Sequence, residues 1–275
     1  TGEGADELFG GYPQYKFMLL HKVILEKMPK SVKGISAEFF RHLPPSFLNL
    51  FFSYAKALGE KGIERFYKYV LANDQAEAYL QQVAIFNEEE QKELLMNNAT
   101  LYAKYSSYYE NNSFKNVVGR CGILDLKGPM VEDLLMKLDK NTMAFGIEAR
   151  APFLDYRLVE LAFQIPDKYK VSFSQNKIVL RKAIRDILTK DKSLVKKKHF
   201  FVPIDNWLDF YLGVIKNDLL SEEFIKKQGI FNYEYIKKIN RDYEKSKLFY
   251  ARQLWTLLTF QIWYKKYFEN QEVKL

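Results

Sequence analysis

The chain has 275 residues, of which 48% are hydrophobic and 16% aromatic; this composition excludes a disordered chain and predicts a packed core. Its 42 lysine and arginine residues exceed its 34 aspartate and glutamate residues, giving a net charge of +8. No arginine-rich tract, zinc finger or RNA-binding aromatic motif accompanies that charge, so we expect no nucleic-acid partner. The single cysteine, Cys121, excludes an intrachain disulfide framework and indicates a reducing, cytoplasmic compartment.

Apolar segments of the chain are too interrupted to span a membrane, and we expect no membrane association. The two most apolar segments, 43–58 and 249–268, contain proline, amide or lysine residues and are typical of buried or amphipathic helices. The first residues lack the basic and apolar regions of a signal peptide. Because the chain starts at a glycine-rich loop without a methionine, we expect a fragment whose N-terminal portion is missing.

Apolar residues recur at three- and four-residue steps along most of the chain, which predicts a mainly α fold. The first helix is expected within 5–27, with a break at Pro13. Further helices are predicted over 36–58, 60–73, 75–85, 88–108, 129–145, 156–164 and 176–188, from about 204, and at 222–227, 233–246 and 249–268.

Local signals refine two of these helices. Asn87, followed by three glutamates, predicts an N-cap with carboxylates in the first helical turn. Pro129 is expected in the first turn of a helix that runs to about Phe145. Four apolar side chains would share its buried face: Met130, Leu134, Leu138 and Met143.

The first seven residues, Thr1–Glu7, combine two glycines with three carboxylates. The glycines allow a sharp turn close to a ligand, and amides at a helix start can face phosphate oxygens. Asp6 and Glu7 can hold Mg²⁺ together with phosphate oxygens and water, and Glu3 suits proton transfer. The alternative is an acidic helix start whose carboxylates only complement the helix dipole.

The longer string Thr1–Tyr12 resembles the SGEGADELFGGY signature of the asparagine synthetase family, with Thr1 in the serine position. All residues from Gly2 to Tyr12 fit the pattern. A lone pair of glycines would be a weak signal, whereas a run of this length is specific.

A second block, from Leu124 to Lys140 and on through Met143-Ala144 to Asp155, is similar to the family's helix and its ExRxPFLD motif. Arginine offers a planar fork for a carboxylate or a phosphate, and an aspartate can cap the following helix. Four side chains are candidates either for substrate binding or for a buried structural ion-pair network: Asp139, Glu148, Arg150 and Asp155.

A third block, Asn176–Ala183, resembles the family's GKxxLRxA helix, with Asn176 in place of the usual glycine. Lys177 at the helix start would be a point charge for the triphosphate and for the transition state, although on its own it would be interpreted as an exposed lysine. The segment Lys196–Pro203 is similar to the KKxGFxxP block, with His199 replacing a glycine. We expect His199 to pack or to hydrogen-bond rather than to catalyse.

The resemblance implies an α/β synthetase domain of the adenine nucleotide α-hydrolase type, of which this chain would be the mainly α, C-terminal helical portion. The parallel-sheet half, the SGGxDS pyrophosphate loop and the N-terminal glutaminase domain would lie outside it. We expect active-site motifs in 1–15 and 121–210, a helical insertion over about 16–120, and C-terminal helices in 211–275.

In the family, ATP adenylates the side-chain carboxylate of aspartate to β-aspartyl-AMP, and ammonia from glutamine then displaces AMP. By position, Glu3 would take a proton from ammonia, Lys177 would stabilise the transition state, and Asp6 would bind Mg²⁺ through pyrophosphate. The resemblance assigns ATP and pyrophosphate binding to Thr1, Gly2, Gly4, Asp6 and Lys177. Because half of the nucleotide site would be absent, we expect the isolated chain to be inactive.

Two alternatives stay open. One is a related amidotransferase or ring-closing synthetase that acts on another carboxylate. The other is a non-catalytic helical binding module that keeps the motifs as remnants. The expected partners are aspartate, ATP, glutamine-derived ammonia and a glutaminase domain of the same polypeptide, and a homodimer is considered as well.

Overall fold

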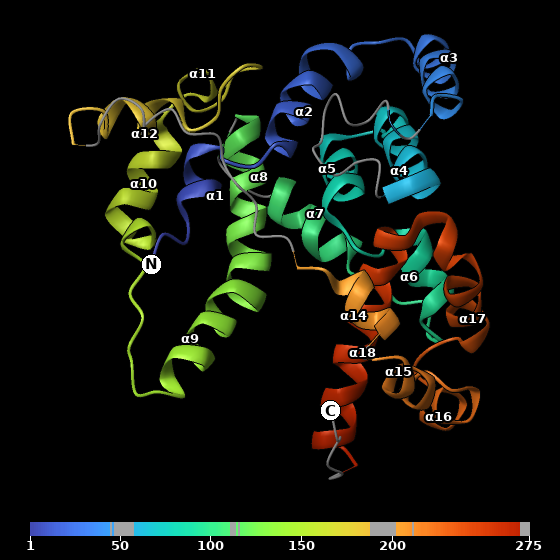
Figure 1. The fold of residues 1–275 in the computed structure, drawn as a ribbon. Helices are drawn as coiled ribbons and strands as arrows, with labels where there is room; N and C mark the ends of the chain where they lie inside the picture. Colours follow the sequence, from blue (N-terminus) through green and yellow to red (C-terminus); the bar gives the residue numbers. More distant parts are fainter. Residues whose placement is uncertain are drawn as a thin grey trace. The chain divides into compact units, whose positions relative to one another are not determined.

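The computed structural model describes residues 1–44, 46, 58–110, 114, 116–187, 202–210 and 212–269. The described residues are mainly helical, as predicted, and their β-type pairing is an isolated bridge between Leu95 and Phe231. The chain divides into two units (Figure 1). Unit 1 comprises Thr1–Lys33, Ala72–Tyr79 and Tyr102–Lys198, and unit 2 comprises Gly34–Leu71, Leu80–Leu101 and His199–Leu275.

Unit 1 holds the three sequence blocks described above. Two helices, α3 (Lys30–Arg41) and α5 (Gln75–Val83), have residues in both units. The remaining elements of unit 1 are α1 (Ala5–Phe9), α2 (Gln14–Leu20), the π-helical η1 (His21–Leu25), α7 (Tyr102–Glu110), α8 (Val117–Asp125), the π-helical η4 (Leu126–Leu135), α9 (Met136–Met143), the 3₁₀-helical η5 (Pro152–Leu154), α10 (Tyr156–Gln164), α11 (Asp167–Lys170) and α12 (Ile178–Ala183).

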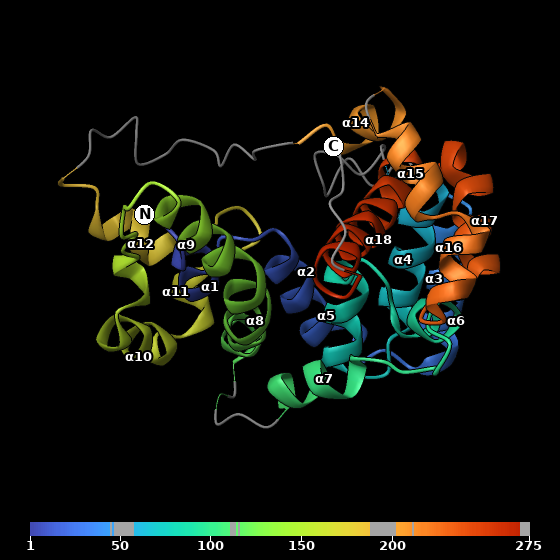
Figure 2. The same ribbon diagram turned by 90° about the horizontal axis from the view of Figure 1, so that it is seen from below.

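Helix α1 is a short helix that contacts α8, α10 and α12 within unit 1 (Figures 1 and 2). Its apolar residues Leu8 and Phe9 form a buried cluster with Ala162 and Phe163 of α10. An isolated helix of this length does not persist in water, because the first helical turn is costly to nucleate. The position of α1 therefore depends on these tertiary contacts.

Helices α8, η4 and α9 follow one another without a break, so Pro129 lies inside a helix rather than in its first turn. The prediction that a helix begins at Pro129 is wrong. Proline removes one backbone donor, and the π-helical hydrogen-bond pattern of η4 accommodates that loss within the helix. Met130 is buried as expected, whereas Met143 is 51% exposed.

The other helix predictions agree with the structure to different degrees. The single helix expected over 88–108 is wrong, because α6 and α7 are separate and Asn98 between them has a φ of 52°. The helix expected over 36–58 begins earlier and ends at Arg41, and 47–57 lies outside the described residues. The helix expected over 176–188 is shorter, and α11 and α15 were not predicted.

Unit 2 is built from helices around one apolar cluster that includes Leu254, Leu257 and Leu258 of α18. None of the helices among the described residues has the length and apolar character needed to cross a bilayer. The elements of unit 2 beyond α3 and α5 are α4 (Gly59–Leu71), α6 (Glu88–Leu94), α14 (Ile204–Phe210), α15 (Gly213–Leu219), α16 (Glu222–Gln228), α17 (Tyr233–Asp242), the 3₁₀-helical η6 (Tyr243–Ser246) and α18 (Lys247–Tyr267).

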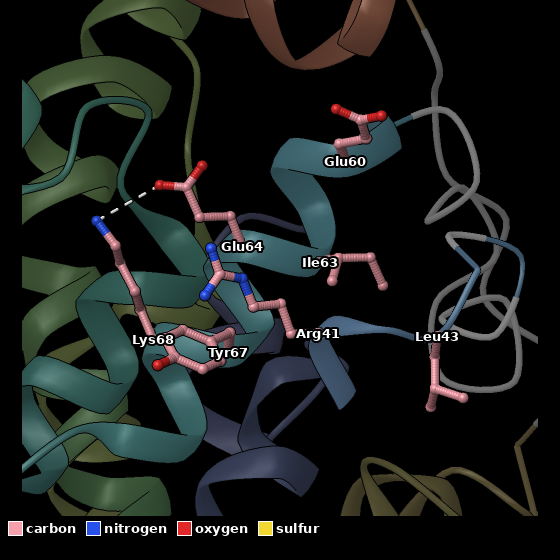
Figure 3. Close-up of a pocket in the computed structure, with 7 residues that line it drawn as sticks. All are labelled: Arg41, Leu43, Glu60, Ile63, Glu64, Tyr67 and Lys68. Atoms are coloured by element: carbon pink, nitrogen blue, oxygen red, sulfur yellow. Dashed lines mark ion pairs between the residues drawn. The ribbon is translucent and has the colours of Figure 1, made fainter. Parts of the chain in front are cut away.

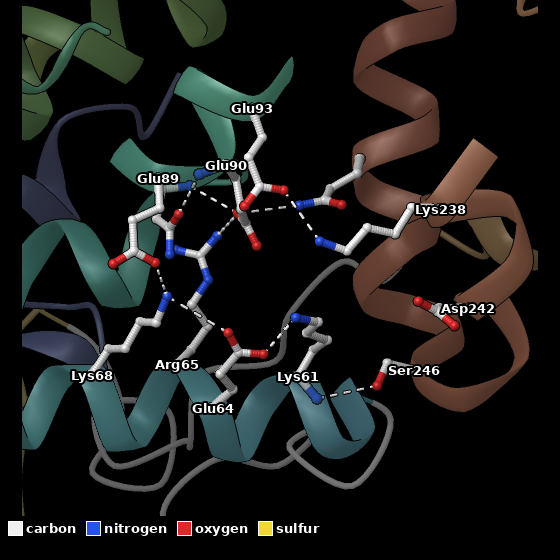
Figure 4. A network of polar contacts seen from close by, with 12 residues as sticks. Lys61, Glu64, Arg65, Lys68, Glu89, Glu90, Glu93, Lys238, Asp242 and Ser246 are labelled. Atoms are coloured by element: carbon white, nitrogen blue, oxygen red, sulfur yellow. Dashed lines mark hydrogen bonds and ion pairs between the residues drawn. The ribbon is translucent and has the colours of Figure 1, made fainter. Parts of the chain in front are cut away.

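A buried ion pair joins two of these helices. Arg65 of α4 donates to Glu90 of α6 at 2.5 Å, and their side chains are only 10% and 13% exposed (Figure 4). Glu90 also accepts from the backbone N–H of Asn87, whose side chain accepts from the Glu90 N–H. The expected N-cap at Asn87 is thus confirmed and is part of a capping box.

Candidate active site

The glycine-rich loop lies directly on the segment that contains the ExRxPFLD motif. The terminal amino group of Thr1 donates to the backbone oxygen of Arg150 at 2.6 Å. Gly4 has a φ of 94°, and a Cβ at this position would lie 2.4 Å from Cδ2 of Leu154. Only glycine combines this backbone conformation with such close packing, so the first two sequence blocks meet at Gly4.

The third sequence block, which contains Lys177, also lies beside the glycine-rich loop. Lys177 has a left-handed backbone with a φ of 54° and stands at the N-terminus of α12. Its Nζ lies 2.9 Å from Oδ1 of Asp6, and both side chains are about one-fifth exposed. A cation and a carboxylate that are distant in sequence therefore form a partly solvated ion pair beside the glycine-rich loop.

Glu3 and Glu7 have different surroundings. Glu3 is half-buried in the loop, whereas Glu7 is buried and accepts from the hydroxyl of Tyr12 at 2.6 Å. Burial raises the pKa of Glu7, and the Tyr12 hydrogen bond opposes this effect only in part. Asp6 rather than Glu7 is accordingly the carboxylate of α1 that a phosphate-bound ion can approach.

The candidates around Arg150 do not form the buried network that was considered. Arg150 and Glu148 pair at 2.7 Å with side chains 80% and 67% exposed. Asp155 binds Arg157 instead and caps α10 by accepting from the Arg157 N–H, which confirms the predicted cap. The Arg157 hydrogen bonds lower the pKa of Asp155. Asp139 is exposed on α9.

Comparison of the sequence with known proteins identifies the family of the chain. The asparagine synthase family model matches residues 1–265. The chain belongs to the asparagine synthase family.

Relatives in this family are considerably longer than the chain. It is 29% identical to asparagine synthetase [glutamine-hydrolyzing] 1 of Bacillus subtilis over 96% of its own length and 39% of that protein. It is 26% identical to a putative asparagine synthetase [glutamine-hydrolyzing] of Mycobacterium bovis over 99% of its length and 40% of that protein. The chain thus spans about two-fifths of the relatives it matches. No solved structure matches it.

The described side chains do not form a metal site by themselves. Within the described ranges, no three histidine, cysteine, aspartate or glutamate side chains converge as a protein-held metal requires. Mg²⁺ commonly binds one or two carboxylates and completes its shell with phosphate oxygens and water. The partly exposed Asp6, next to the cationic Lys177, fits that pattern.

A buried carboxyl group of unit 1 was missed in the sequence. Asp125 of α8 accepts from the hydroxyls of Tyr15 and Tyr79 at 2.5 and 2.6 Å. Burial raises its pKa to about 7, although the two tyrosine hydrogen bonds lower it. An aspartate inside the mostly apolar segment Val117–Leu126 was the available signal, but no local pattern identified its two tyrosine partners.

One hollow of unit 2 contains none of the family motifs. It has a volume of about 590 Å³, and Figure 3 shows Arg41 and Tyr67 along its wall, with Lys68 paired to Glu64. The guanidinium of Arg41 lies 5.5 Å from the centre of the Tyr67 ring. These groups already interact with one another, so we assign this hollow no part in the candidate site. The block Lys196–Phe201, with His199, lies outside the described residues.

Proposed function

We propose that this chain contributes one wall of an ATP-dependent site that makes asparagine from aspartate. The observation that carries the proposal is the ion pair between Asp6 and Lys177 at 2.9 Å. Two family motifs far apart in the sequence each supply one of its charges. A coincidental surface pair would not be expected to join both motifs at the edge of the glycine-rich loop.

The first step would be attack by the aspartate side-chain carboxylate on the α-phosphorus of ATP, with release of pyrophosphate. Lys177 would balance the negative charge on the leaving pyrophosphate. Asp6 would hold Mg²⁺, which when bound offsets further phosphate charge. By their positions in the family motif, Thr1, Gly2 and Gly4 would lie against the nucleotide.

The second step would be attack by ammonia on the activated acyl carbon, with AMP as the leaving group. Glu3 would take the proton that the attacking nitrogen loses. Arg150, whose guanidinium is mostly exposed, would bind an anionic group of the substrate. Ammonia would come from a glutaminase domain of the same polypeptide, because the relatives are named glutamine-hydrolyzing synthetases.

The two half-reactions can be tested separately in the full-length natural polypeptide. Aspartate-dependent ATP–pyrophosphate exchange reports the first step, and asparagine formation from ammonia reports both. We expect Lys177→Met to abolish both activities. Glu3→Gln should keep exchange but lower asparagine formation by about 10²–10⁴-fold, the usual contribution of a general base.

The dependence of exchange on the carboxylic acid supplied decides between this proposal and the two alternatives. Exchange that depends on a different carboxylic acid, with aspartate inactive, would assign the site to another amide-forming or ring-closing synthetase. Absence of exchange with any carboxylic acid, in a protein that is folded, would favour a helical module that keeps the motifs without the reaction. The isolated chain of residues 1–275 is expected to be inactive in the same assays.

A further inference from the structure

Asn176 forms a hydrogen bond between the two segments that carry the charges of the site. Its Nδ2 donates to the backbone oxygen of Gly11 at 3.0 Å. The backbone N–H of Gly11 in turn donates to the backbone oxygen of Asp6 at 2.8 Å. Asn176 is therefore connected to Asp6 through one intervening residue, while Lys177 follows it directly in the chain.

The backbone around Asn176 is itself held in place. Nε of Arg181 donates to the Asn176 backbone oxygen at 3.0 Å. Ser172 donates its N–H to the oxygen of Gln175 at 2.8 Å and closes the turn before Asn176. Lys177 then adopts a left-handed conformation that is unfavourable for a residue with a Cβ. Such a conformation persists only where surrounding contacts fix it.

Lysine has four rotatable side-chain bonds, so the separation of Asp6 and Lys177 depends on how firmly their backbones are joined. Gly11 lies under both charged groups, because a Cβ there would meet Oδ1 of Asp6 and Cε of Lys177. The Asn176 amide acts on the carbonyl of this same residue. Its hydrogen bond thus fixes the backbone at the point where both side chains pass.

We propose that Asn176 is a positioning residue that sets the distance between Asp6 and Lys177 and thereby the affinity for magnesium pyrophosphate. The inference rests on the proposed function for its ligand, but the positioning itself can be measured without any ligand. Asn176 need not touch the substrate, since it acts through the Gly11 carbonyl.

The test compares Asn176→Ala with a matched control in unit 2, in the polypeptide as the cell makes it. Nδ2 of Asn232 donates to the backbone oxygen of Glu93 at 3.1 Å, so Asn232→Ala removes a bond of the same kind away from the motifs, together with the bond by which Asn232 caps α17. The first readout is the rate at which an amine-reactive reagent modifies Lys177, followed by peptide mass spectrometry. We expect Asn176→Ala to raise that rate several-fold and Asn232→Ala to leave it unchanged.

The second readout is the affinity for magnesium pyrophosphate. Asn176→Ala should weaken it by roughly five- to tenfold, which is what one neutral hydrogen bond contributes. In an Asp6→Asn background the same substitution should add nothing, because coupled residues are not additive. Equal losses in both backgrounds, or an unchanged labelling rate of Lys177, would overturn the positioning role. If the unmodified protein does not bind magnesium pyrophosphate, the proposed function fails and the labelling rate alone decides the role of Asn176.

Discussion

Gly11 lies so close to Asp6 that a Cβ on the glycine would come within 1.7 Å of the aspartate Oδ1. It would also lie 2.4 Å from Cε of Lys177, so Gly11→Ala must move one or both charged groups. We expect this variant to lose at least about tenfold in magnesium pyrophosphate affinity, with overpacking costing about 1–3 kcal/mol of unfolding free energy. Calorimetric titration and urea unfolding measure the two effects.

Gly34 provides the steric control for that experiment. It lies inside α3, and a Cβ there would meet no heavy atom within 4 Å beyond its chain neighbours and the backbone of its own helix. Gly34→Ala should leave pyrophosphate binding unchanged and stabilise the protein by about 0.5–1 kcal/mol, because alanine loses less backbone entropy in a helix. Gly11→Ala binding as tightly as Gly34→Ala would mean that the packing at Gly11 does not set the ion pair.

Asp125 should make stability depend on pH. Its folded pKa is about 7 against 3.8 for an unperturbed carboxyl, so between these values the folded state keeps a proton that the unfolded state has lost. The free energy of unfolding should therefore fall as pH rises from about 4 to 7, by about 4 kcal/mol in total. Asp125→Asn cannot lose a proton, and the difference between variant and parent should follow that curve. A constant difference from pH 4 to 8 would show that Asp125 is already ionised in acid.

Lys170 should destabilise the protein at neutral pH. Its side chain is fully buried, with the ammonium 5.3 Å from the centre of the Phe163 ring, and burial lowers its pKa to about 8. The unfolded chain binds the proton more tightly, so stability should rise as pH increases from about 8 to 10.5. Lys170→Met removes the buried charge and should stabilise the protein at pH 7 by up to about 3 kcal/mol.

The neighbouring Lys168 controls for the change of charge. It is exposed on the same helix α11, and Lys168→Met should alter stability by less than about 0.5 kcal/mol at every pH. Chemical unfolding at pH 7 and at pH 10 distinguishes the variants. Destabilisation by Lys170→Met at pH 7 would mean that the ammonium has a stabilising partner.

The buried pair of Arg65 and Glu90 in unit 2 should be sensitive to loss of either charge (Figure 4). Glu90→Gln keeps the shape of the side chain but removes the carboxylate that pairs directly with the guanidinium in a buried site. We expect a loss of about 3–5 kcal/mol. Glu222→Gln breaks the exposed pair with Lys226 and should cost less than about 0.5 kcal/mol. Similar losses in the two variants, measured by urea unfolding, would contradict this ranking.

Elements with local end signals could be predicted from the sequence. Helix α10 has the predicted bounds, because Asp155 caps its start and Pro166 follows its end. Helix 88–108 was predicted as one element because its apolar spacing continues, whereas the left-handed backbone at Asn98 separates α6 from α7. The helix start predicted at Pro129 was wrong for a different reason, because the π-helical segment η4 accommodates this proline within a continuous helix.

The candidate site could be predicted only as a set of residues. The motifs named Asp6 and Lys177, but nothing in their spacing indicated that the two charges pair. The partners of Asp125 were equally inaccessible, because Tyr15 and Tyr79 lie 110 and 46 residues away in the chain. Long-range contacts of this kind depend on packing between helices, and local periodicity carries no information on them.

The shortness of α1 has a consequence for when the site can exist during synthesis. The helix takes its place from α8, α10 and α12, all of which leave the ribosome after it. A nascent chain that ends before Lys177 has already exposed the glycine-rich loop but lacks the cation that faces Asp6. Such a truncated product cannot form the ion pair. Premature termination before Lys177 therefore yields chains that carry the glycine-rich loop without the opposite charge of the candidate site.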